Sequence, residues 1–368
     1  MLRWSDIATE LYVLILALSS VFGGCSTDPT PEWSRDYVKA LQESTQLVSE
    51  LGSRQVINRS ALRRIHDHPD LTLALPSTKD RRYSIPSGPT LNVRSFWDMG
   101  SCEIARLVAY RNSPLGRSML PSQHFIYDAR FIYSAPRCDT KDSGKESVKI
   151  AVESKLKSWN QRWWNAVWGG RELGRYLSRS WPRGRVLRRV DAQDESTFTW
   201  LAQLDPRDAL EIRDQFEQRI GSLPKYVGGK IIDEAAEVIY ILRESDVMLR
   251  RLDQRLRSLD LKSSQHTSVS KRLCENLMQA KSSYIKFQSL VSLRYQALLA
   301  LSKALTPITL RISAPTPNVQ NFITWWLGGL QGAKVSALKE LRKLSRAHVQ
   351  IWGERGVLRV CRAHALHE

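Results

Sequence analysis

Two long stretches in the second half of the chain repeat apolar residues at helical spacing. Residues 231–261 place Leu242, Leu249 and Leu256 seven apart, with further leucines between them. Residues 269–305 continue the pattern with Leu273, Leu277, Tyr284, Phe287, Val291, Tyr295, Leu298 and Leu301. Apolar residues at this spacing are typical of helices that pack along a shared seam. We therefore predict a mainly α fold, a helical bundle built around a long antiparallel αα-hairpin.

Shorter helices are predicted on either side of this hairpin. A first helix is expected at 33–51, where Gly52 ends it, and another begins at Pro121, because proline suits the first helical position. The remaining predicted helices are 96–112, 148–168, 172–177 and one or two after Asn318, with a break at 142–144. Two proline-containing stretches are expected to be extended: 67–93 as a surface loop and 306–317 as a strand or loop.

The N-terminus carries an apolar run that is too short to span a bilayer. Residues 11–18 have the length of a signal-peptide core, and small residues follow up to Cys25. The segment Val21-Phe22-Gly23-Gly24-Cys25 resembles the lipobox of bacterial lipoproteins. This resemblance implies a signal peptide at 1–24 and acyl chains, such as palmitate, on Cys25. The alternative is an uncleaved N-terminal anchor.

The predicted organisation follows from this processing. Residues 25–32 would form a lipid-anchored tether, and 33–368 a single helical domain that could be subdivided near 185–228. Ser26 stands where sorted lipoproteins that stay in the inner membrane carry Asp, so the resemblance implies an outer-membrane lipoprotein facing the periplasm.

Four cysteines remain if Cys25 is acylated. An even number of cysteines in an exported chain favours disulfides. Of the three pairings, Cys102–Cys138 with Cys274–Cys361 is preferred, because each bond then closes one half of the chain. Four buried thiols are the alternative, and no spacing of Cys and His suggests zinc.

The net charge of +18 indicates an anionic partner. Removal of 1–24, which carry Arg3 against Asp6 and Glu10, raises it to +19. Such a surplus attracts anionic lipid, lipopolysaccharide or nucleic acid. The densest basic run contains Arg171, Arg175, Arg179 and Arg183, whose planar guanidinium groups suit phosphate oxygens. A merely solvated basic surface is the alternative.

A second candidate site lies where one predicted helix ends and the next begins. Its polar residues are Arg111, Asn112, Ser113, Arg117, Ser122 and Gln123. They could form a binding lip, with helix N-terminal amides available to an anion, or simply a capped corner between helices. Trp159, Trp163, Trp164 and Trp168 present a similar choice between a binding surface and the core.

The same region carries a family resemblance. Cys102-Glu103, the run 110–123, the run 127–131 and Cys138, together with the C-terminal His348-Val349-Gln350-Ile351-Trp352, resemble an uncharacterised family of Gram-negative lipoproteins known only as a domain of unknown function. The resemblance implies an envelope location and a single-family architecture. It implies no activity.

No catalytic, nucleotide-binding or metal motif stands out, so no cofactor, metal or catalytic residue is expected. The leading hypothesis is an envelope lipoprotein that binds an anionic component or a partner protein. One alternative is an enzyme, or enzyme accessory, that acts on peptidoglycan or lipid through the lip. The other is a cytoplasmic nucleic-acid-binding protein, which the export signal and the cysteines disfavour.

Overall fold

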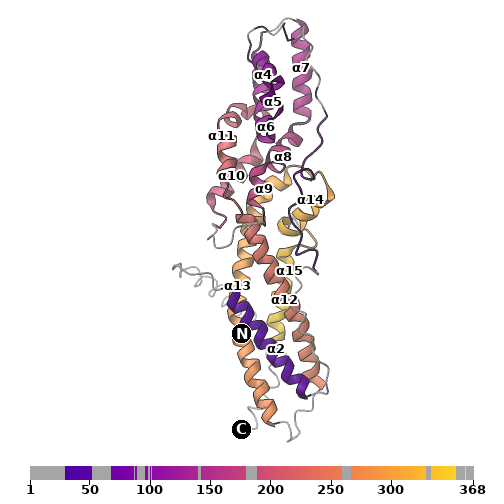
Figure 1. Ribbon diagram of the computed structural model, residues 1–368, viewed down its shortest axis with the longest axis vertical. Helices are drawn as coiled ribbons and strands as arrows, with labels where there is room; N and C mark the ends of the chain where they lie inside the picture. Colours follow the sequence, from indigo (N-terminus) through magenta and orange to yellow (C-terminus); the bar gives the residue numbers. More distant parts are fainter. Residues whose placement is uncertain are drawn as a thin grey trace, which may run out of the picture.

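The computed structural model describes residues 30–51, 68–86, 88, 96–97, 100, 102–139, 142–179, 189–258, 267–328, 333–353 and 361. The predicted signal peptide, Cys25 and most of the tether lie outside these residues, as does Arg183. The described part is α-helical and contains no strand, which confirms the predicted fold class. Figure 1 shows an elongated molecule whose longest helices follow its long axis.

The helices follow one another in this order: α2 (Thr30–Leu51), α4 (Glu103–Asn112), α5 (Pro114–Arg117), α6 (Pro121–Ser134), η3 (Ala135–Arg137), α7 (Asp142–Lys157), α8 (Trp159–Val167), α9 (Arg171–Tyr176), α10 (Ala192–Gln203), η4 (Pro206–Asp208), α11 (Ala209–Gly221), α12 (Val227–Ser258), α13 (Thr267–Leu310), α14 (Pro317–Phe322), the π-helix η6 (Ile323–Leu327) and α15 (Ala337–Ile351). None of the helices that the structure describes is both long and apolar enough to cross a membrane.

The lower part of the molecule in Figure 1 is a bundle of α2, α12, α13 and α15. The predicted seam residues are its core: Leu242, Leu249 and Leu256 of α12 and Leu273 and Leu277 of α13 are all buried. α2 packs chiefly against α13, and α15 against α12. The residues that join α12 to α13, 259–266, lie outside the described part, so the hairpin connection stays a prediction.

The upper part gathers α4 to α8 with α10 and α11 (Figure 1). Here α6 packs against both α8 and α11. The four tryptophans of 159–168 lie inside this region, with Trp163, Trp164 and Trp168 fully buried and Trp159 5% exposed. Trp164 and Trp168 stack on each other, with ring centroids 5.2 Å apart. These side chains therefore belong to the core and do not form a binding surface.

Several predicted boundaries are wrong. α2 begins at Thr30, within the expected tether, and α7 begins at Asp142, where a break was expected. The predicted helix over 148–168 is divided at Ser158, whose hydroxyl donates to the carbonyl of Ser154 at 2.9 Å.

The C-terminal end of α13 also differs from the prediction. The helix continues through Pro307 to Leu310, although 306–317 was expected to be a strand or loop. A proline inside a helix removes one backbone hydrogen bond. Leu305 and Ile308 on either side of it are fully buried, so their burial outweighs that loss.

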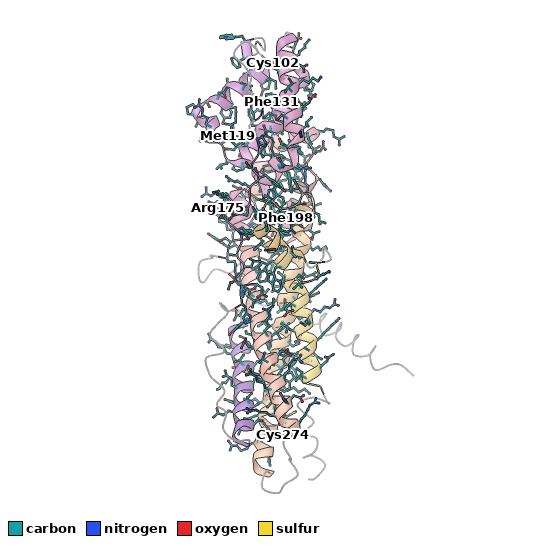
Figure 2. All side chains as sticks on the ribbon, turned by 90° about the vertical axis from the view of Figure 1, so that its right-hand side faces the viewer. Cys102, Met119, Phe131, Arg175, Phe198 and Cys274 are labelled. Atoms are coloured by element: carbon teal, nitrogen blue, oxygen red, sulfur yellow. A yellow bond between two sulfur atoms is a disulfide. The ribbon has the colours of Figure 1, made fainter. Side chains whose placement is uncertain are left out.

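Two disulfides lie toward opposite ends of the molecule, as the labels of Cys102 and Cys274 show in Figure 2. Cys102 is bonded to Cys138, with Cα atoms 5.5 Å apart, and Cys274 to Cys361, with Cα atoms 5.4 Å apart. Both distances are ordinary for disulfides. These are the two pairs preferred from the sequence.

Candidate functional site

The upper part of the molecule contains a cavity of about 760 Å³. Its walls come from the α4–α5–α6 corner, from the helices α7 and α8, and from Arg82, Ile85, Pro86 and Gly88. The polar and charged residues that line it are Arg82, Arg111, Asn112, Arg117, His124, Asp128, Ser154, Lys155, Arg162 and Asn165. Apolar side chains, among them Val108, Phe125 and Phe131, complete the lining.

The α4–α5–α6 corner is shaped by local hydrogen bonds. Ser113 caps α5, since its hydroxyl accepts from the amide of Gly116 at 3.1 Å. Arg111 donates to the carbonyl of Gly116 at 2.6 Å, and Arg117 donates to the carbonyl of Asn112 at 3.1 Å. Each arginine is thus tied to the backbone of the corner through one donor, which fixes where the guanidinium group lies.

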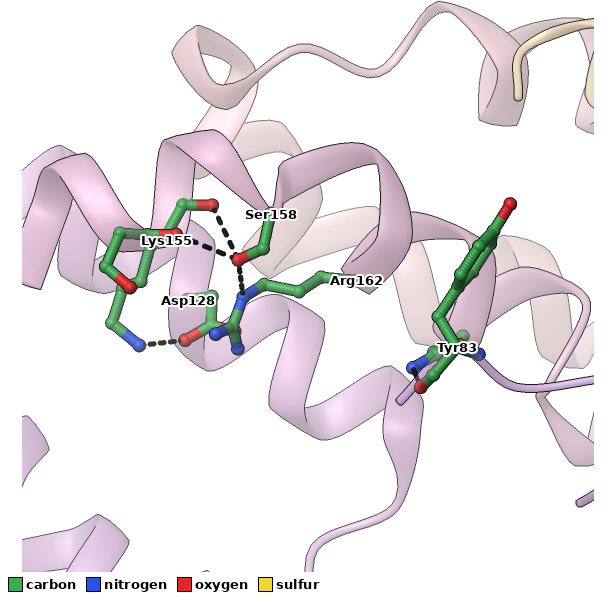
Figure 3. A network of polar contacts seen from close by, with 7 residues as sticks. Tyr83, Asp128, Lys155, Ser158 and Arg162 are labelled. Carbon is green, nitrogen blue, oxygen red and sulfur yellow. Dashed lines mark hydrogen bonds and ion pairs between the residues drawn. The ribbon is translucent and has the colours of Figure 1, made fainter. Parts of the chain in front are cut away.

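The centre of the site is the buried carboxylate of Asp128 on α6 (Figure 3). Arg162 donates to one carboxylate oxygen at 2.6 Å, and the ammonium group of Lys155 is paired with the other. Arg162 also donates to the hydroxyl of Ser158 at 2.8 Å. The Asp128 side chain is only 3% exposed. A carboxylate so far from water is stable only with such partners.

The cavity has a strong excess of positive charge. Five cations line it, Arg82, Arg111, Arg117, Lys155 and Arg162, against one acid, Asp128, which leaves a net charge of +4. A guanidinium group carries five N–H donors. Among the described residues, protein hydrogen bonds use no more than two donors of any of these four arginines. The remaining N–H groups have no protein partner among the described residues and can donate to an anion.

Burial lowers the pKa of two groups in the cavity. Burial lowers the pKa of His124, and the positive charge of Arg111 lowers it further, so the imidazole is neutral at neutral pH. Burial also lowers the pKa of Lys155, while Asp128 acts in the opposite direction. The Lys155 ammonium group lies 5.1 Å from the ring centroids of both Tyr127 and Phe131, a cation–π arrangement.

Only part of the predicted lip belongs to the cavity lining. Arg111, Asn112 and Arg117 line it. Ser113 caps α5, as described, and Gln123 accepts a hydrogen bond from the amide of Leu120 at 3.0 Å at the start of α6. Ser122 is buried. The corner is therefore a capped corner between helices, and part of it also forms one wall of the cavity.

The most buried charges of the site were missed from the sequence. Asp128 lies between Tyr127 and Ala129, all three buried, and it is the sole acid in α6. An acid within an apolar stripe is a signal for a buried ion pair. Its partners Lys155 and Arg162 lie 27 and 34 residues further along the chain, and no periodicity connects them to it.

The second predicted site is the basic run of arginines on and after α9, of which Arg183 lies outside the described residues. Arg179 is paired with Asp233 of α12 and donates to the carbonyl of Leu71 at 3.0 Å, so it joins segments of the fold. Arg171 is exposed and Arg175 half-buried on the short helix α9. Arg175 lies midway along the molecule in Figure 2.

The described residues contain no cluster of three or more His, Cys, Asp or Glu side chains that could hold a metal ion. Among the described residues, fold and site together define an all-helical protein with a large cationic cavity. The family model described as "Protein of unknown function (DUF3080)" matches residues 63–364, and the chain belongs to this family. No curated protein and no solved structure is detectably similar to it.

Proposed function

We propose that this protein is an envelope lipoprotein that binds an anionic group, of the phosphate type, in the cavity beside the α4–α5–α6 corner. The observation that carries the proposal is the lining of that cavity, in which five cations accompany one buried acid. Elsewhere in the fold, Arg179 is paired with the acid Asp233. Arg82, Arg111 and Arg117 donate only to backbone carbonyls among the described residues.

The shape of the site supports a compact anion over a long polyanion. Its cations line a cavity, whereas a nucleic-acid backbone needs cations spread along a groove or a face. Guanidinium groups offer paired N–H donors to the oxygens of a phosphate or carboxylate. The low exposure of Lys155 and Arg162, 16% and 18%, would strengthen their attraction for a bound anion.

Two observations support the envelope location. The segment before Cys25 resembles a lipobox, and two pairs of cysteines lie at disulfide distance, as is usual in an oxidising compartment. Mass spectrometry of the membrane-extracted chain, beside a Cys25→Ala variant, tests this part. Loss of residues 1–24 with added acyl mass would support it, and an unprocessed, unmodified chain would contradict it.

Calorimetric titration of the purified full chain with inorganic pyrophosphate tests the binding site. The double variant Arg111→Gln, Arg117→Gln should bind at least about tenfold more weakly, because a hydrogen bond to a charged group contributes roughly 1.5–3 kcal/mol. Arg106→Gln with Arg207→Gln is the matched control: it removes the same charge at two exposed positions outside the cavity. Equal weakening of both variants would mean that only the net charge matters and would contradict a defined site.

A further inference from the structure

The α4–α5–α6 corner, which forms one wall of the cavity, carries exposed apolar side chains as well as charge. Leu115 is 71% exposed, Tyr110 51% and Leu120 46%. Each lies next to the cavity lining in the sequence: Tyr110 precedes Arg111, Leu115 stands between Asn112 and Arg117, and Leu120 precedes Pro121. The same corner therefore presents both hydrogen-bond donors for an anion and apolar surface to its surroundings.

The hydrogen bonds of Ser113, Arg111 and Arg117 shape the backbone of the corner. The side chains of Leu115 and Leu120, in contrast, are largely exposed and contribute little buried apolar surface to the fold. Apolar residues grouped beside a binding cavity commonly mark the surface that receives a ligand or a membrane.

The chemistry of the site is that of an amphiphile. An anionic phospholipid combines a negatively charged headgroup with acyl chains, and the site combines the cationic groups of Arg111, Arg117 and Arg162 with exposed apolar side chains on the adjoining corner. We infer that the ligand of this cavity is the headgroup of a phospholipid with a net negative charge, with Leu115 and Leu120 inserted among the acyl chains nearest the headgroup. This inference rests on the proposed function, whose anion it identifies.

The position of α2 agrees with a membrane surface along the side of the molecule. Tyr37, in the second turn of α2, stacks on Phe287, with ring centroids 5.2 Å apart. Phe287 lies near the middle of α13, 20 residues after Thr267 and 23 before Leu310. The five residues 25–29 span at most about 18 Å. An acylated Cys25 would therefore keep the middle of the bundle near the bilayer, and both ends of an elongated molecule could lie along it.

Site-specific photocrosslinking of the full acylated chain tests the inference. The chain is reconstituted in phosphatidylcholine vesicles that contain a minor fraction of phosphatidylglycerol, with a photoreactive residue in place of Leu115. Cross-linked phosphatidylglycerol should exceed its share of the vesicle lipid several-fold. The enrichment should disappear in the Arg111→Gln, Arg117→Gln background. Val335, which is 62% exposed and not part of the cavity lining, is the matched control position and should show no enrichment.

The outcomes separate this inference from the proposed function. Pyrophosphate binding without lipid cross-links at position 115 would overturn the lipid inference and leave anion binding in place. Cross-links that carry no excess of phosphatidylglycerol would also overturn it, because they would show membrane contact without selection of an anionic headgroup. If the chain with Arg111 and Arg117 intact shows neither pyrophosphate binding nor enrichment, both the inference and the proposed function are overturned.

Discussion

The indole N–H of Trp352 donates to the phenolic oxygen of Tyr37, with the two atoms 3.3 Å apart. This bond joins the second turn of α2 to the residue that follows α15, across a sequence separation of 315. The Tyr37 ring is fully buried among Tyr284, Phe287 and His348. α2 begins before the residues matched by the family model, 63–364, yet it supplies part of the core.

Tyr37→Ala should lower the free energy of unfolding by about 3–5 kcal/mol, the usual cost of truncating a large buried aromatic side chain. Tyr37→Phe keeps the ring, loses only the hydrogen bond, and should cost about 1 kcal/mol. Equilibrium unfolding in urea measures both. A loss below 1 kcal/mol for Tyr37→Ala would show that α2 is not integral to the bundle.

Stability should fall as the pH drops from about 7.5 to about 5.5, since histidines titrate near pH 6.5 in the unfolded chain. Burial lowers the pKa of His348, while the Leu344 carbonyl and Asp246 act in the opposite direction. At a pH below the pKa that His348 has in the unfolded chain, the unfolded state therefore binds more protons than the folded state. Each histidine of this kind lowers the free energy of unfolding by up to about 1.4 kcal/mol per pH unit.

Urea midpoints at the two pH values test this prediction. His348→Gln should reduce the dependence on pH, and His124→Gln should reduce it separately, because burial lowers the pKa of His124 as well. If the pH dependence is unchanged in both variants, it does not arise from His348 and His124, and the prediction is wrong.

Asp128→Asn should destabilise the upper part of the molecule strongly. The substitution leaves Lys155 and Arg162 largely buried without their acid, and breaking a buried pair costs about 3–5 kcal/mol. Asp214→Asn is the control, because Asp214 pairs with Arg213 at the exposed surface and should have little effect. Thermal unfolding followed by circular dichroism compares the two variants. Equal effects would mean that the ion pairs of Asp128 contribute no more to stability than an exposed pair.

Gly116→Ala should disturb the cavity wall. A Cβ atom there would overlap the carbonyl oxygen of Tyr110 and come within 2.7 Å of the Arg111 backbone. Because all of these are backbone atoms, the corner must open, at a cost of about 1–3 kcal/mol, and Arg111 must shift. Pyrophosphate should then bind more weakly. Gly221→Ala is the control, since a Cβ atom at Gly221 meets nothing within 4 Å; a similar loss of binding there would contradict the argument.

The sequence predicted features that depend on local spacing. The apolar repeats of α12 and α13, the start of α6 at Pro121 and the preferred cysteine pairs all agree with the structure. The assembly of the cavity could not be predicted, because Arg82, Asp128 and Arg162 come from separate elements and meet only through tertiary packing. The extension of α13 past Pro307 was missed for a related reason. Proline tends to end a helix, but the burial of Leu305 and Ile308 by tertiary packing outweighs that tendency.

The Cys102–Cys138 disulfide encloses part of the cavity lining. It closes a loop that contains Arg111, Arg117, His124 and Asp128, so much of the cavity lining lies inside one covalent ring. A chain that stayed in a reducing cytoplasm would keep both cysteines as thiols and lack this closure. If the chain is exported, as proposed, formation of this bond would couple completion of the proposed ligand site to passage out of the cytoplasm.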